Sequence, residues 1–265
     1  MNIFIREMKA NRTSLIIWCI GVFLMIISGM GKYAGLSTTG QSINELLSQM
    51  PKSLQAIMGI GTFDLSTASG YYGVLFIYLA VMATIHAAML GANIISKEER
   101  DKTAEFLFAK PISRNRIITS KLLASLINIF IFNLVTLISS IFMVQKYSNG
   151  EAIMGDITIL MIAMFILQLI FLLIGTAIAA ISKNPKTATS LSTGILLITF
   201  MLSIAIDLNS RIENLKYLTP FKYYDAKNLM LDGGFDTVYI ILSIVIIAAL
   251  LSGTYLFYKK RDLNV

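Results

Sequence analysis

The chain has 265 residues, of which 56% are hydrophobic and 14% carry a charge, and its formal net charge is +7. Soluble domains carry about 25% charged residues, so a water-soluble protein of this composition could not cover its apolar surface, and lipid must replace water around much of it. Cys19 is the only cysteine and lies inside an apolar run, which excludes an intrachain disulfide and a cysteine-based metal site. The basic residues form no stripe with aromatic residues outside the loops, so we expect no nucleic-acid partner.

Residues 1–12 are predicted to form a short amphipathic helix at the membrane interface. Phe4 and Met8 share one helical face, with Ile5 beside them, and the segment also holds three basic residues that suit anionic lipid head groups. A frayed basic tail is the alternative interpretation.

Six segments without Asp, Glu, Lys or Arg are each long enough to cross a bilayer. A transmembrane helix needs about 20 mostly apolar residues, and one such charge at mid-span would cost about 2.5–3.5 kcal/mol. The segments are residues 13–31, 71–95, 122–144, 157–182, 187–206 and 238–258. Barrel strands would be about 10 residues long and alternate in polarity. The predicted fold is therefore an all-α integral membrane protein with six transmembrane helices, in a single permease domain over residues 1–265.

Positive charge is unevenly distributed among the segments that join these spans. If the N-terminus is cytoplasmic, the inside segments are 1–12, 96–121, 183–186 and 259–265, and they hold 15 of the 22 lysine and arginine residues. Cytoplasmic loops carry the excess of Lys and Arg. The distribution therefore predicts that both the N- and C-termini are cytoplasmic.

The two long outer segments, 32–70 and 207–237, are expected to be structured. Residues 41–58 have an amphipathic pattern interrupted by Pro51, and a long loop with its own apolar periodicity is more consistent with structure than with disorder. In the second segment, clustered aromatic residues favour the packing of a re-entrant or surface helix. They are Tyr217, Phe221, Tyr223 and Tyr224.

Small residues recur every four positions in the second and fourth spans. Ala83, Ala87 and Gly91 share one helical face, and Gly175 shares another with Ala179. Such faces let helix backbones approach closely in lipid. They predict tight helix packing, either within the chain or between subunits.

His86, the only histidine, lies near the middle of the second span. An ionisable residue at that depth suggests a proton or substrate role, but neutral histidine is inexpensive to bury, and we favour an interhelical hydrogen bond. Asn128, Asn133 and Gln168 also lie within spans and are predicted to link helices in the same way.

Residues 96–121 form the largest cytoplasmic loop, and apolar residues recur in it at the spacing of one face of a short helix. They are Ala104, Leu107, Phe108 and Pro111. Asp101 or Thr103 would cap the start of this helix, and Pro111 would end it. The apolar face would either lie on the inner membrane surface or insert into a groove on a cytoplasmic partner, and the pattern alone leaves both open.

Nucleotide-binding and catalytic motifs are absent. The only Gly-Lys pair, Gly31-Lys32, precedes Tyr33 and lacks the upstream glycine of a phosphate-binding loop. No HExxH motif or nucleophile elbow is present. The chain is therefore predicted not to hydrolyse ATP and not to be an enzyme.

Within residues 96–121 the sequence resembles the ABC type-2 permease family, the membrane subunits of many bacterial ABC exporters. That family shows an acidic pair, then Thr-x-Glu-x-Leu, a proline, a Ser/Arg-Arg element and a lysine that opens the next span. The matching residues are Glu98, Glu99, Thr103, Glu105, Leu107, Pro111, Ser113, Arg114 and Lys121. A glycine commonly precedes the threonine, where this chain has Lys102. The amphipathic start, the six spans and Thr219-Pro220-Phe221 extend the similarity.

The resemblance implies that residues 99–112 form a coupling helix that docks into a separate ATPase subunit. The implied contacts are Glu99, Thr103, Ala104, Glu105, Leu107, Phe108, Pro111 and Arg114. ATP and Mg would be bound by that ATPase, so no cofactor is expected in this chain. The resemblance also implies two permease subunits, identical or related, around a shared path in the bacterial cytoplasmic membrane.

Three other classes of protein are weighed against this reading. A secondary transporter driven by an ion gradient would be expected to need carboxylates or an unwound helix at the midplane, and no span contains a carboxylate. A lipid-modifying membrane enzyme would need a convergent polar catalytic set, which the spans lack. A purely structural or immunity-type membrane partner would need no such residues.

Overall fold

The computed structural model describes residues 3–38, 50–60, 63–103, 112–148, 153–182, 184–231 and 234–260, and no strand occurs among them. The long helices are α1 (Ile3–Thr38), α4 (Ala68–Arg100), α6 (Arg114–Tyr147), α7 (Met154–Ile181), α8 (Pro185–Leu208) and α11 (Thr237–Lys260). The shorter ones are α3 (Lys52–Met58), the 3-10 helix η1 (Ser210–Leu218), α9 (Pro220–Tyr223) and α10 (Ala226–Leu231).

Each of the six long helices is long and apolar enough to cross a membrane. They coincide with the six predicted spans and extend beyond most of them, so the all-α membrane fold is confirmed. At α6 the extension has a local cause, since the helix begins at Arg114 because Ser113 caps it: the backbone N–H of Arg116 donates to Ser113 Oγ at 3.4 Å.

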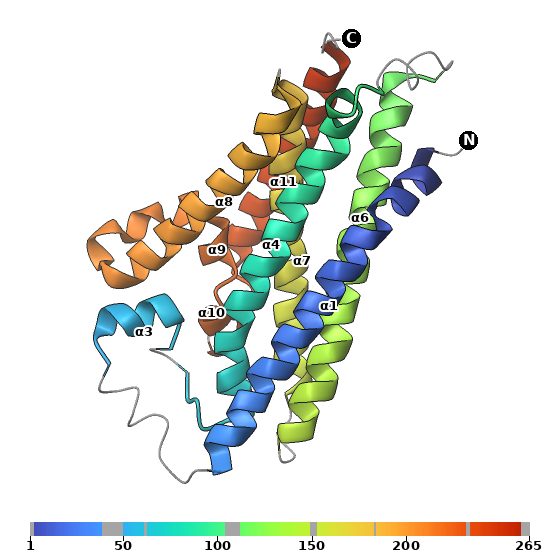
Figure 1. Cartoon of the computed structure of the whole chain (residues 1–265). Coiled ribbons are helices and arrows are strands. Elements are labelled where there is room, and N and C mark those ends of the chain that lie inside the picture. Colours follow the sequence, from blue (N-terminus) through green and yellow to red (C-terminus); the bar gives the residue numbers. More distant parts are fainter. Residues whose placement is uncertain are drawn as a thin grey trace.

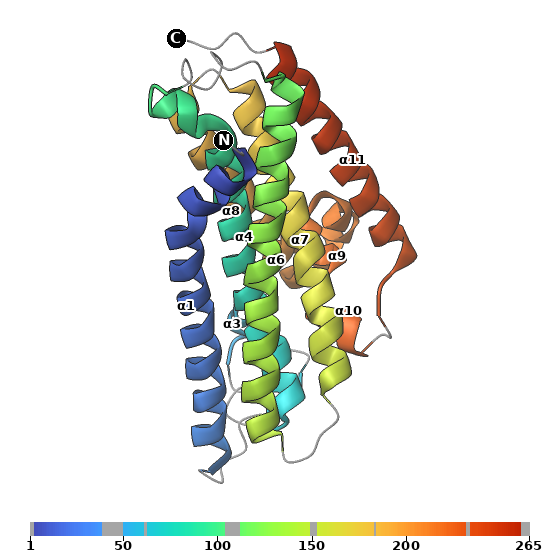
Figure 2. The same ribbon diagram turned by 90° about the vertical axis from the view of Figure 1, so that its right-hand side faces the viewer.

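The six helices form an elongated bundle with both described chain ends at the same end (Figure 1). We call this the terminal end, and it also contains Arg100, Arg114 and Ile181, where α4 ends, α6 begins and α7 ends. The opposite end is called the far end. α1 lies along one edge of the bundle and α11 along the other (Figure 2).

The centre of the bundle is a close contact between the backbones of α4 and α7. A Cβ atom at Gly91 would overlap the Leu172 carbonyl oxygen and lie 3.0 Å from its carbon. A Cβ at Gly175 would overlap the Ala88 carbonyl oxygen and lie 2.8 Å from the backbone nitrogen of Ala92. The predicted small-residue faces therefore pack against each other within the chain.

The N-terminal segment differs from the prediction of a separate interfacial helix. Residues 3–12 are the first turns of α1, because no glycine or proline separates them from the following span, and these turns bend toward α6 (Figure 2). Phe4 and Met8 pack on a buried cluster that includes Ile94 and Ile118, whereas Ile5 beside them is exposed. The apolar face thus serves packing inside the protein.

The outer segments are structured where they are described. In the amphipathic stretch 41–58, α3 begins directly after Pro51, whose carbonyl oxygen accepts a hydrogen bond from the Leu54 N–H at 2.9 Å; residues 41–49 lie outside the described ranges. After α8 the chain folds back as η1, α9 and α10 toward the centre of the bundle (Figure 1).

The aromatic residues of this returning segment divide between the interior and the surface. Tyr223 is buried and its ring stacks on Tyr239 of α11 with centroids 5.0 Å apart. Tyr224 is also buried, and its hydroxyl lies 2.7 Å from Ser243 Oγ. Tyr217 remains exposed. Two of the four predicted interfacial aromatics therefore hold the returning segment against α11.

Candidate functional site

The two flanks of the predicted ATPase-contact segment lie at the terminal end. Residues Ala104, Glu105, Leu107, Phe108 and Pro111 lie outside the described ranges. Glu99 lies in the last turn of α4 and Thr103 just beyond it. Arg114 opens α6 and donates to the Lys259 carbonyl oxygen of α11 at 2.9 Å. The described residues of the segment thus lie where α4 and α11 end and α6 begins.

The turn after α4 keeps the geometry that a glycine would favour. Lys102 has a φ of 56°, in the left-handed region. Its N–H donates to the Glu99 carbonyl oxygen at 3.2 Å, and the Thr103 N–H donates to the Glu98 carbonyl oxygen at 2.8 Å. These two bonds form a Schellman motif. Lys102 therefore adopts, at this position, the left-handed conformation that glycine adopts without strain.

The other flank is fixed by apolar packing. Ile112, the last residue of the predicted coupling segment, packs on Ile3 of α1 and Ile117 of α6. The segment between the flanks is consequently attached at one end to α4 and at the other to α1 and α6.

A buried charge cluster lies directly beneath these flanks and joins three helices. It consists of Arg6 and Glu7 of α1, Lys97 and Glu98 of α4, and Lys121 of α6. Arg6 pairs with Glu98 at 2.8 Å and with Glu7 at 2.9 Å, Lys97 pairs with Glu7, and Lys121 pairs with Glu98. We refer to these five residues as the charge cluster.

The members of the charge cluster are shielded to different degrees. The side chains of Glu7 and Lys121 are 0% exposed and that of Glu98 is 7% exposed, and Lys121 also donates to the Ile94 carbonyl oxygen. Removing an ion from water costs several kcal/mol unless it is paired. The pairing therefore compensates these buried charges and connects the ends of α1, α4 and α6, which we call the helix block.

Sequence reasoning missed this cluster as a site. The sequence identifies Glu98 and Lys121 only as residues of a motif, and Glu7 lies within the segment 1–12 that it predicts to be an amphipathic helix. The Glu7–Lys97 pair joins residues 90 positions apart and Lys121–Glu98 joins residues 23 apart. The one available signal was Glu7 itself, the single acid among the basic residues of 1–12.

The predicted polar links between spans are present for three side chains. Asn133 of α6 donates from Nδ2 to Gln168 Oε1 of α7 at 3.3 Å and to the Met161 carbonyl oxygen at 3.1 Å. Asn128 Nδ2 lies 3.3 Å from the sulfur of Met8 in α1. These contacts link α6 to α7 and to α1.

His86 behaves differently from the prediction of an interhelical hydrogen bond. Its Nδ1 atom is buried and has no hydrogen-bond partner in the described part of the chain. Its ring instead stacks on Phe132 of α6 with centroids 5.0 Å apart and lies 5.4 Å from the Trp18 ring of α1. The residue fills an aromatic site between three helices.

Replacing His86 with phenylalanine is therefore expected to preserve or raise thermal stability. A buried nitrogen without a hydrogen-bond partner destabilises the folded protein by about 1–3 kcal/mol, and the change removes this nitrogen. It also keeps an aromatic ring between Trp18 and Phe132. Thermal unfolding of the purified protein in detergent measures the effect. If transport were lost while stability was unchanged, His86 would have a proton or substrate role.

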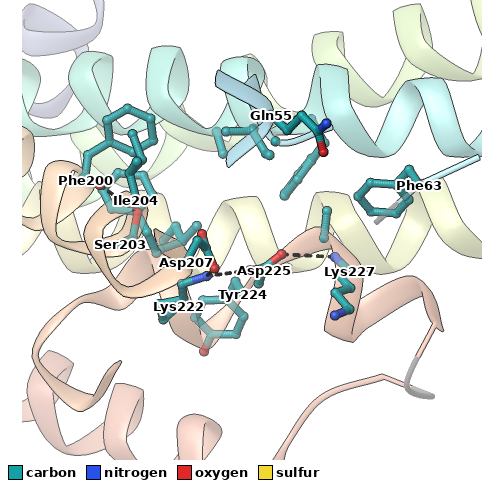
Figure 3. Close-up of a pocket in the computed structure, with 17 residues that line it drawn as sticks. Gln55, Phe63, Phe200, Ser203, Ile204, Asp207, Lys222, Tyr224, Asp225 and Lys227 are labelled. Carbon is teal, nitrogen blue, oxygen red and sulfur yellow. Dashed lines mark hydrogen bonds and ion pairs between the residues drawn. The ribbon is translucent and has the colours of Figure 1, made fainter. Parts of the chain in front are cut away.

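A cavity of about 450 Å³ lies between α3, α4, α7, α8, α9 and α10. Its charged wall is formed by Lys222 between Asp207 and Asp225 (Figure 3). Lys222 Nζ pairs with Asp225 at 2.9 Å and also with Asp207. The remaining wall is mostly apolar and includes Phe63, Phe76, Ile77, Leu167, Phe200, Ile204 and Phe221.

Lys222 is charged at neutral pH. Burial lowers its pKa, but the charges and hydrogen bonds of Asp225 and Asp207 outweigh burial and raise the pKa above its usual value. The sequence did not predict this trio, because Asp207 ends a span while its partners follow a 3-10 helix.

Comparison with known protein families agrees with this architecture. A model of the ABC-2 family transporter proteins matches residues 1–263, nearly the whole chain. No curated protein matches the sequence. Members of this family are permeases that work with an ATPase subunit in the bilayer and are not themselves catalytic. With its six membrane-spanning helices, the chain belongs to the ABC-2 family of transporter proteins and is a multi-pass permease of the cell membrane.

Proposed function

We propose that the chain is the permease subunit of an ATP-driven exporter, in which a separate ATPase contacts residues 99–112. The observation that carries this proposal is the attachment of both flanks of residues 104–111 to the helix block. Thr103 is bonded to the Glu98 carbonyl oxygen, and Ile112 packs on Ile3 and Ile117. A displacement imposed on the segment between them would pass directly to α1, α4 and α6.

The orientation of the molecule supports the same proposal. The terminal end carries Lys97, Arg100, Arg114 and Lys260, and positive residues remain on the cytoplasmic side of a membrane. We therefore place the terminal end in the cytoplasm, where ATP is available. ATP and Mg would be bound by the partner ATPase.

A second permease subunit, identical or related, is part of the proposal. Helices α8 and α11 expose large apolar side chains such as Ile198, Met201 and Ile244. In a membrane these faces must meet lipid or another protein. We infer that two permeases face each other around a shared path and that closure of the ATPase pair switches the path between inward- and outward-facing arrangements.

Changing both Leu107 and Phe108 to aspartate is expected to abolish recovery of the ATPase with the permease. Charges on the apolar face of the coupling segment would have to be buried in the groove of the partner, which is costly without a counter-charge. The permease is purified from its native membranes through an affinity tag. ATP hydrolysis by the purified complex is then measured, and its subunits are identified by mass spectrometry.

The matched control changes Leu215 and Leu218, two exposed residues of η1, to aspartate and so adds the same two negative charges. This variant should retain the ATPase at the wild-type level. Undiminished ATPase recovery with the Leu107→Asp, Phe108→Asp variant would refute docking through this segment.

A further inference from the structure

An apolar groove of about 410 Å³ runs between α1 and α6, which lie side by side (Figure 2). It is lined by five side chains of α1 between Leu15 and Phe23 and by Ile131 and Val135 of α6. All of these residues belong to charge-free spans, so the groove faces the hydrocarbon layer of the membrane. An empty groove would forfeit dispersion contacts, and either a lipid chain or another protein must therefore fill it.

Two basic side chains of α1 lie at the terminal-end side of the groove and on the same helical face. Lys9 and Arg12 are exposed, and they precede Ile16 of the groove by seven and four residues, a spacing that places residues on one face of a helix. Arg12 precedes Leu15, the first lining residue, by about 4.5 Å along the helix axis. An occupant that fills the groove and reaches these side chains must be apolar with a negative charge at one end.

The positive charge of Lys9 and Arg12 is not compensated by the described part of the chain, in which neither side chain forms an ion pair. Glu7 is the single acidic residue of α1, and it is buried and already paired with Arg6 and Lys97. Helix α6, which forms the other wall of the groove, contains no acidic residue. The two helices therefore supply no carboxylate that could pair with either cation.

A second copy of the chain fits this surface less well than a lipid does. Two copies in one membrane that meet through the same surface bring the same residues together. Lys9 and Arg12 of one copy would then approach the same two cations of the other, and like charges in an interface repel. An anionic lipid supplies both the apolar chain and the opposite charge, and basic residues at a membrane surface attract such lipids.

We propose that the groove binds one acyl chain of an anionic phospholipid, whose phosphate lies beside Lys9 and Arg12 in the leaflet at the terminal end. A zwitterionic phospholipid with the same chains fits the groove equally well but brings no net charge to the two cations. Binding requires neither ATP nor an ATPase, so failure of this site would leave the proposed function unchanged.

Trp18, the only tryptophan of the chain, provides the signal for a test. It directly precedes Cys19 of the groove and is partly exposed, so bromine atoms on a bound acyl chain would quench its fluorescence. The purified permease is placed in phosphatidylcholine nanodiscs that contain increasing fractions of brominated phosphatidylglycerol or of brominated phosphatidylcholine with the same chains. The quenching curves are expected to show a relative affinity about tenfold in favour of phosphatidylglycerol.

Two results of this measurement would overturn the proposal. Equal quenching by the two lipids would show an unselective lipid shell around the protein. Quenching by neither lipid would show that another occupant, such as a second copy of the chain, covers the groove.

Lys9→Gln combined with Arg12→Gln is expected to abolish the preference for phosphatidylglycerol while leaving quenching by phosphatidylcholine unchanged. The matched control, Lys259→Gln with Lys260→Gln, removes two exposed lysines from the end of α11, at the opposite edge of the bundle (Figure 2), and should keep the wild-type preference. Val135→Phe fills the groove from α6 and is expected to weaken quenching by both lipids.

These variants also define the results that contradict the site. An undiminished preference after loss of Lys9 and Arg12, or undiminished quenching in Val135→Phe, would place the lipid elsewhere. An equal loss of preference in the control with Lys259 and Lys260 changed would show that the overall charge of the protein surface, rather than this site, attracts the lipid.

Discussion

Gly91→Ala is expected to break the packing between α4 and α7 and to cause a large loss of stability. The new Cβ would overlap the carbonyl oxygen of Leu172, a backbone atom that no rotamer change can move. The helices must separate along their line of closest approach. Overpacking typically costs about 1–3 kcal/mol, and more where the backbone has to shift.

Gly175→Ala tests the same contact from the other helix and is expected to have a similar effect, because its Cβ would overlap the Ala88 carbonyl oxygen. The measurement is the midpoint of thermal unfolding in detergent, together with the yield of monodisperse protein.

Gly194→Ala in α8 and Gly253→Ala in α11 are the matched controls. A Cβ at either position meets nothing within 4 Å, and alanine is favoured over glycine inside a helix by about 0.5–1 kcal/mol. These controls should unfold at or above the wild-type temperature. A Gly91→Ala protein as stable as they are would show that α4 and α7 do not touch at this point.

Glu98→Gln is expected to destabilise the terminal end severely. It leaves Lys121, which is 0% exposed, without its carboxylate partner, and takes Arg6 away from the same carboxylate. Removing one member of a buried pair typically costs about 3–5 kcal/mol, because the other charge stays buried and uncompensated. The loss would be measured as a lower unfolding temperature.

The rescue variant makes this prediction specific to charge. When Lys121→Met is added to Glu98→Gln, the buried ammonium that has lost its carboxylate partner is removed. Glu7 stays paired with Arg6 and Lys97, so stability is expected to recover in part. The exposed pair of Glu213 and Lys216 supplies the contrast, since Glu213→Gln should leave the unfolding temperature unchanged. If the double variant lost as much stability as the Glu98→Gln and Lys121→Met variants lose together, the pairing of Glu98 with Lys121 would be contradicted.

The spans and their tightest contact were predictable from local sequence patterns. Long runs without charged residues indicate membrane helices. The recurrence of small residues every four positions around Gly91 and Gly175 indicates that helix backbones approach closely there. The start of α6 was less predictable, since the cap at Ser113 rather than hydrophobicity determines that this helix begins at Arg114.

The sites depend on contacts that no local pattern contains. Glu7 looks like a solvated residue until α4 places Lys97 beside it, and Lys222 looks like a loop lysine until the chain folds back under α8. Buried charges of this kind are determined by tertiary pairing across many residues. For residues 104–111 the docking assignment stays a prediction.

The helices of the bundle differ in length. α1, α4 and α6 contain 36, 33 and 34 residues, whereas α8 and α11 contain 24 each. At about 1.5 Å per residue, the first group is about 50 Å long and the second about 36 Å. The hydrocarbon layer that matches the short helices is thinner than the layer that matches the long helices. A change in membrane thickness therefore changes the mismatch at α8 and α11 differently from the mismatch at α1, α4 and α6.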